Sequence, residues 1–195
     1  MNPIFQFPTY LLKRQAIALT GKFRFYDPAG RLVMFSEQKM FRLREDIRVY
    51  GDEAKSQEML MIKARQIIDF SAAYDVIDSA SNQKVGVLRR KGWRSLVRDQ
   101  WEVLDANDTV TGLLFEDSVQ LALLRRFLLG SLLPQNYDMT LGSERVADLR
   151  QRFNPFAYQL DMDFSMDRAH RLDRRLGIAA GILLAAIEGK QKTES

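Results

Sequence analysis

The chain has 195 residues, of which 46% are hydrophobic and 28% are charged, a composition that excludes disordered and fibrous proteins. It has no cysteine and one histidine, which excludes disulfides, zinc–thiolate sites, thiol nucleophiles and metal sites made of several histidines. The net charge is only +4, and the length suits one domain, which we expect to span residues 1–195.

Residues 1–20 contain apolar stretches but do not resemble a signal peptide. Lys13 and Arg14 interrupt the segment in its middle, and no small-residue cleavage site follows. We therefore expect no secretory targeting here, and the lack of cysteine fits a cytoplasmic protein.

Three segments share a pattern in which an aromatic residue and two later apolar residues lead to an aspartate. The segments are residues 23–27, 74–78 and 101–105. Each is followed by turn-forming residues and then by a second run typical of a strand, at residues 31–36, 84–90 and 110–115. The sequence therefore predicts three β-hairpins.

The segment between the first two hairpins is open to two interpretations. Alternating apolar residues over 41–49, a turn at Gly51 and a return over 59–64 favour two more strands. The composition of residues 37–65 would also permit a helix. Three further strands are predicted towards the C-terminus, at residues 137–141, 145–153 and 156–164.

Two helices are predicted. Ser118 is a suitable cap for a short helix over residues 119–133, which Pro134 would end. Asp173 is a suitable cap for a second helix over residues 173–188.

The second helix has no polar face through its central turns, so it must be buried on every side. Small residues would let the surrounding backbone approach it closely: Gly177, Ala179, Ala180, Gly181, Ala185 and Ala186. In a strand-rich chain, a sheet that closes around the helix as a barrel provides this burial. The uncharged run over residues 176–187 would be about 18 Å long, too short for a bilayer core of about 30 Å. We therefore expect no transmembrane helix.

Six blocks of sequence, together with the apolar helix, carry a resemblance to a known family. They lie at residues 19–23, 26–30, 74–76, 86–101, 153–156 and 172–176, and the central block reads Gly-Val-Leu-Arg-Arg-Lys-Gly-Trp-Arg-Ser-Leu-Val-Arg-Asp-Gln-Trp. The chain resembles the Tubby C-terminal-like superfamily, and within it the bacterial LURP-one-related proteins, with phospholipid scramblases as more distant relatives. The resemblance implies a mainly β fold, a closed antiparallel barrel of about twelve strands around a hydrophobic C-terminal helix, with one short accessory helix.

The positive charge is concentrated in one segment. Residues 79–98 contain six basic residues and no acidic residue, whereas the rest of the chain has 23 basic and 25 acidic residues. The candidate anion- or lipid-binding residues are Arg89, Arg90, Lys91, Arg94 and Arg98. Strand alternation sends Arg89 and Lys91 to one face and Arg90 to the other, so one patch cannot contain them all.

The alternative interpretation of this segment is a solvated hairpin face whose cations pair with nearby acids. An internal ion pair between Arg98 and Asp99 would equally serve the barrel. Nucleic acid is a disfavoured ligand, because the basic segment is short and the rest of the chain is net negative.

Two acidic segments invite comparison with calcium sites. Asp161, Asp163 and Asp167 precede the terminal helix, but they are too few for a calcium ligand set. Residues 105–116 resemble an EF-hand loop at their ends, but Val110 stands where the sharp turn needs glycine. We therefore predict no metal site.

No catalytic or cofactor-binding residue is assigned. The single histidine, His170, lies between Arg168 and Arg171, which is typical of a residue at the surface or at a barrel mouth. No pair of carboxylates stands out for acid–base chemistry, and glycine-rich nucleotide loops are absent.

Tubby domains bind phosphoinositides, so the resemblance implies a non-enzymatic binding or tethering domain with anionic phospholipid as its first candidate ligand. The expected location is the cytoplasm, with peripheral contact at a membrane surface. The alternative function is an intracellular structural or regulatory module that binds another protein. Scramblase-like lipid transfer and an unrecognised enzyme are less favoured, because a helix-filled barrel leaves little room for an internal pocket.

Overall fold

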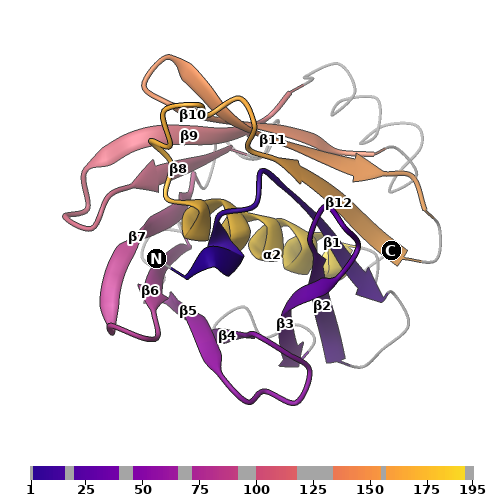
Figure 1. Ribbon diagram of the computed structural model, residues 1–195. Helices are drawn as coiled ribbons and strands as arrows, with labels where there is room; N and C mark the ends of the chain where they lie inside the picture. Colours follow the sequence, from indigo (N-terminus) through magenta and orange to yellow (C-terminus); the bar gives the residue numbers. More distant parts are fainter. Residues whose placement is uncertain are drawn as a thin grey trace.

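The computed structural model describes residues 2–15, 20–39, 46–65, 72–91, 100–117, 134–154 and 157–191 (Figure 1). Its elements in chain order are η1 (Pro3–Phe5), β1 (Thr9–Gln15), β2 (Thr20–Tyr26), β3 (Leu32–Lys39), β4 (Ile47–Tyr50), β5 (Glu58–Ala64), β6 (Ala73–Asp78), β7 (Gln83–Arg90), β8 (Gln100–Leu104), β9 (Val110–Glu116), β10 (Asn136–Leu141), β11 (Glu144–Arg152), β12 (Ala157–Asp163) and α2 (Arg174–Gln191).

The twelve strands form one closed antiparallel barrel. Each strand pairs with its neighbours in the chain, and β1 closes the barrel by pairing with β12, where Leu12 lies opposite Leu160. Closure leaves no sheet edge exposed. The mainly β fold and the closed barrel expected from the resemblance are therefore confirmed.

The three predicted hairpins are confirmed as β2–β3, β6–β7 and β8–β9. Residues 37–65, between the first two hairpins, had two interpretations. Their described part contains the strands β4 and β5, so the helical interpretation is wrong for that part. The three predicted C-terminal strands are β10, β11 and β12. The helix predicted over residues 119–133 lies outside the described residues.

Strand β1 was not predicted, and a buried arginine explains why. Tyr10, Leu12 and Arg14 alternate on its inner face, and Arg14 is only 7% exposed. Its Nη1 donates a hydrogen bond to the carbonyl oxygen of Ala185 at 2.9 Å. A cation at an inward position breaks the apolar alternation by which a strand is read from sequence.

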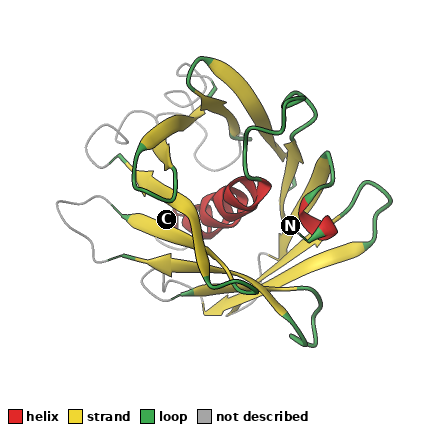
Figure 2. Ribbon diagram, turned by 60° about the vertical axis from the view of Figure 1, so that its left-hand side comes forward, coloured by secondary structure: helices red, strands yellow, loops and turns green. Residues whose placement is uncertain are grey.

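Helix α2 occupies the barrel interior, as its lack of a polar face predicts (Figure 2). Its cap is Asp173, whose Oδ1 accepts a hydrogen bond from the backbone N–H of Arg175 at 3.1 Å. Ile178 and Ile182 are fully buried. Inward side chains of the strands fill the space between helix and barrel wall, and the largest of them are Phe23, Phe25, Trp101 and Tyr137.

The two ends of the barrel differ in their connections. The turns of five hairpins lie at the end where α2 begins, and we call it the turn end: residues 27–31, 51–57, 79–82, 105–109 and 142–143. Strand β7 runs away from this end, so Arg89 and Arg90 lie at the opposite end of the barrel, towards which α2 also runs.

Candidate anion-binding surface

Strands β5 to β8 carry a group of cations that point outward from the barrel. We call this group the basic face, and its members are Lys63, Arg65, Lys84, Arg89 and Lys91. On β5, the fully buried Ile62 points inward, and its exposed neighbour Lys63 therefore points outward. The same alternation on β7 places Leu88 inside and Arg89 outside.

Glu102 on β8 holds two of the predicted residues together. It lies directly across the strands from Arg89, and the two side chains form a salt bridge of 2.6 Å between Nη2 and Oε2. Lys91 Nζ lies 3.1 Å from the other oxygen, Oε1. Partial burial alone would raise the pKa of Glu102, but hydrogen bonds and charge from Arg89 and Lys91 outweigh it and lower the pKa.

A second cluster of the basic face joins β5 and β7 to the β8–β9 turn. Arg65 Nη2 lies 2.6 Å from Asp75 Oδ1 and 2.7 Å from Asp108 Oδ1, and Lys84 Nζ lies 3.2 Å from the same Asp108 oxygen. Hydrogen bonds from Arg65 and Lys84 lower the pKa of Asp108. The cluster therefore has two cations and two carboxylates and is neutral as a group.

Arg90 lies on the other face of β7, as strand alternation predicts. It stands across from the buried Trp101, and its charge acts on the inward-pointing Tyr74. Burial raises the pKa of Tyr74, and the charge of Arg90 lowers it in part. The structure therefore brings Arg89 and Lys91 together and separates Arg90 from them.

Two of the five predicted residues, Arg94 and Arg98, lie outside the described residues, as does Asp99. Anion binding by the five candidates stays a prediction. The pairing of Arg89 and Lys91 with Glu102 agrees with the alternative interpretation, a solvated hairpin face whose cations pair with nearby acids.

Two members of the basic face, Lys63 and Arg65, do not belong to the segment on which the sequence interpretation rested. Lys63 is exposed and makes no ion pair within the described part of the chain. The alternation in residues 59–64 signals that Lys63 points outward, but it does not signal that β5 lies two strands from β7. Among the described residues, the basic face has five cations, which pair with three carboxylates.

The aspartates compared with calcium ligands have partners within the protein. Asp161 forms a bidentate pair with Arg152, with distances of 2.6 and 2.7 Å. Asp163 Oδ1 accepts the backbone N–H of Ser165, and both carboxylate oxygens of Asp167 accept backbone N–H groups. In the described ranges, no group of three or more metal-ligating side chains is placed to hold an ion.

The segment that resembles an EF-hand is the β8–β9 hairpin. Asp105 Oδ1 accepts the backbone N–H groups of Asn107 and Thr109, which forms the turn between the two strands. His170 is exposed at the turn end, with its Nδ1 3.3 Å from Arg174 Nη2. Across the described residues, the model contains no helix with the length and apolar character needed to span a bilayer.

In a comparison with known protein families, a family model described as LURP-one-related matches residues 32–185, which contain most of the barrel and most of α2. Comparisons with curated proteins and with solved structures give no match.

Proposed function

Because the chain belongs to the LURP-one-related family, we propose that it is a non-enzymatic binding domain that holds anionic phospholipid head groups on its basic face. The observation that carries this proposal is the concentration of cations on one outer surface, where the described residues include five cations and three paired carboxylates. Cations near an anionic membrane surface each contribute about 1 kcal/mol of attraction.

The filled interior supports a binding role at the outer surface. Helix α2 is surrounded by the barrel, and the inward side chains around it, among them Leu12, Leu88 and Leu160, are fully buried. A ligand therefore meets the protein on the outside of the strands or at the barrel ends. Peripheral contact with a cytoplasmic membrane surface belongs to the same proposal.

Among the described residues of the basic face, Arg89, Lys91 and Glu102 form a part with two cations and one carboxylate, whereas the cluster around Asp108 is balanced. The Arg89 side chain is 42% exposed, so it is accessible to an anionic head group. Lys63, exposed two strands away, adds a further charge on the same face.

The test is co-sedimentation of the full chain with vesicles of phosphatidylcholine alone and with vesicles that also contain phosphatidylserine or a phosphoinositide. We expect the protein to bind the anionic vesicles at low salt and to be released at about 1 M salt, where the Debye length falls to about 3 Å. The double variant Arg89→Gln/Lys91→Gln should bind at least about fivefold more weakly. Glu102→Gln should bind more tightly, because it removes a carboxylate that pairs with both cations.

The matched control is Arg150→Gln/Arg152→Gln on β11, which removes two outward cations that also pair with acids, Asp148 and Asp161. It should leave vesicle binding almost unchanged. If the wild-type protein ignores anionic vesicles at low salt, or if the control weakens binding equally, the lipid proposal is wrong. The function as a module that binds another protein is then the hypothesis to pursue.

A further inference from the structure

The junction between β3 and β4 has the shortest ladder in the barrel. Within the described residues, β3 and β4 share two residue pairs, Phe35 with Tyr50 and Ser36 with Val49. Every other junction between neighbouring strands has at least four such pairs. Within the described part of the strands, fewer backbone pairs therefore join β3 to β4 than join any other two neighbours.

A buried side chain adds a hydrogen bond between β3 and β4 beside their short ladder. Ser36 is fully buried, and its Oγ donates a hydrogen bond of 2.7 Å to the carbonyl oxygen of Arg48 on β4. This bond crosses the junction beside the last paired residues. It satisfies a backbone carbonyl that would otherwise lose its partner in a buried setting.

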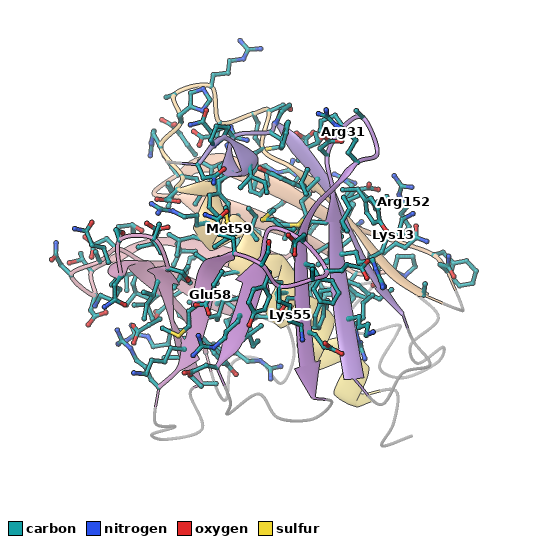
Figure 3. The ribbon with its side chains drawn as sticks, turned by 60° about the horizontal axis from the view of Figure 1, so that its bottom comes forward. Lys13, Arg31, Lys55, Glu58, Met59 and Arg152 are labelled. Atoms are coloured by element: carbon teal, nitrogen blue, oxygen red, sulfur yellow. The ribbon has the colours of Figure 1, made fainter. Side chains whose placement is uncertain are left out.

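The β4–β5 turn, residues 51–57, reaches back across the same junction on the outside. Lys55 Nζ lies 2.7 Å from Glu37 Oε2 on β3. Glu53 forms a bidentate pair with Arg24 on β2, with distances of 2.6 and 3.3 Å. The turn therefore forms ion pairs with both β2 and β3, across the junction from β4. Lys55 is labelled in Figure 3.

These ion pairs lie over an apolar side chain that points outward. Phe35 stands across from Arg24 on β2, and it is only 2% exposed although it lies outside the core cluster. The guanidinium of Arg24 lies 5.8 Å from the centre of the Phe35 ring. The contact covers part of the Phe35 ring at the place where the ladder is short.

Lys55 adopts a strained backbone conformation at this position. Its φ of 59° lies in the left-handed region, which glycine and asparagine adopt more readily than lysine. Strain that persists at one residue indicates that another requirement holds the residue there. Here the turn built by Asp52 requires the left-handed conformation, and a lysine at this position, unlike a glycine, supplies an ammonium group to Glu37.

We propose that the barrel opens at the β3–β4 junction and that the β4–β5 turn is an ion-pair strap that keeps it closed. Opening separates β3 from β4 and exposes the inward side chains Met34 and Val49, while the eleven longer junctions stay paired. The strap lies on the β2–β5 side of the barrel, so this inference does not depend on lipid binding at the basic face.

The experiment is backbone amide hydrogen exchange on the full chain, resolved by residue, at low salt and at about 1 M salt. Amides of β4 should exchange faster than amides of β12 and α2, because the amides of β12 and α2 exchange only through global unfolding. Lys55→Gln and Glu53→Gln should each speed exchange in β4 about two- to fivefold, because an exposed ion pair contributes up to about 1 kcal/mol. High salt should produce the same change in the wild-type protein.

Two further variants make the result specific. Lys55→Gly removes the cation and also the left-handed strain, so it should speed exchange in β4 even where it raises global stability. Arg152→Gln breaks a more exposed bidentate pair across the longer β11–β12 ladder, and it should leave β4 unaffected. The proposal is overturned if β4 exchanges at the rate of α2, or if Lys55→Gly slows exchange in β4.

Discussion

At the scale of single residues, four aspartates build the same turn. The backbone carbonyl of each accepts the N–H of the residue three positions later at 2.9–3.2 Å, and its carboxylate accepts the N–H four positions later at 2.9–3.1 Å. The aspartates are Asp27, Asp52, Asp105 and Asp167, and the left-handed residues three positions later are Gly30, Lys55, Asp108 and His170. Asp27, Asp52 and Asp105 thereby close hairpins at the turn end, whereas Asp167 shapes the loop that leads into α2.

Asp27 is the most enclosed of these residues, and its side chain is fully buried. Burial alone would raise the pKa of Asp27, but hydrogen bonds and charge from Arg31, with a further bond from the Ala29 N–H, outweigh it and lower the pKa. A lowered pKa in the folded protein means that the unfolded chain binds the proton more readily. The carboxylate therefore stabilises the fold above its ordinary pKa of about 3.9, and this contribution disappears as the pH falls through the folded-state value.

We therefore expect Asp27→Asn to lower the free energy of unfolding at neutral pH and to have a much smaller effect under strongly acidic conditions. Urea unfolding of the wild-type protein and the variant at both pH values is the measurement. Asp46→Asn, which changes an exposed side chain, is the control. Parallel losses of stability in the wild-type protein and Asp27→Asn as the pH falls would contradict this account.

At the scale of elements, the small residues of α2 are not equivalent. Gly177 faces the ring of Phe164, and an added Cβ there would overlap the ring. Gly181 faces Met162, and an added Cβ would lie 2.9 Å from its Sδ and Cε atoms. Phe164 and Met162 follow one another along one side of the barrel, so both glycines let the helix approach this side closely.

Gly177→Ala is expected to destabilise the protein more than Gly181→Ala. The rigid ring of Phe164 cannot move aside, whereas the flexible side chain of Met162 can. Alanine gains about 1 kcal/mol of helix propensity, and overpacking costs about 1–3 kcal/mol, so we expect a net loss of up to about 2 kcal/mol at Gly177. Thermal or urea unfolding measures the difference.

The control for this pair is Gly51→Ala, because a Cβ at Gly51 would lie 3.8 Å from Met59 Sδ, an ordinary contact distance. It should be neutral or slightly stabilising. A Gly177→Ala protein as stable as the control would show that the helix does not need its close approach to Phe164.

At the scale of the whole molecule, a closed barrel around one helix makes the interior a single core. The cluster of buried side chains includes residues from all twelve strands and from α2. A substitution that shortens a buried side chain of α2 therefore weakens the packing of the barrel as a whole. It also follows that the protein should unfold in one cooperative step apart from local opening at the β3–β4 junction.

Ile182 lies on α2 and is fully buried, so Ile182→Ala should lower the free energy of unfolding by about 2–5 kcal/mol. Val110, at the start of β9, is 47% exposed, and Val110→Ala should change stability by less than about 0.5 kcal/mol. Urea unfolding followed by tryptophan fluorescence reports on both variants, because Trp101 is part of the same core. Equal effects of the two substitutions would contradict the central position of α2.

Much of the barrel can be predicted from local pattern, and the parts that cannot have identifiable causes. The aspartate turns identify the hairpins because their hydrogen bonds join residues at most four positions apart. Strand β1 escapes prediction because Arg14 occupies an inward position whose partner, the carbonyl of Ala185, lies at the other end of the chain. The short ladder between β3 and β4 has no signal in the sequence at all.

The burial of α2 on every side and the common face of Arg89 and Lys91, opposite to Arg90, follow from the amino-acid sequence alone, because both depend on the period of a helix or a strand. Which charges meet depends on the tertiary structure. Arg65 and Lys84 share Asp108, and the turn after β4 reaches Glu37 and Arg24, because closing the barrel brings distant strands together. Periodicity specifies the face on which a side chain lies, whereas strand pairing and register choose its neighbour.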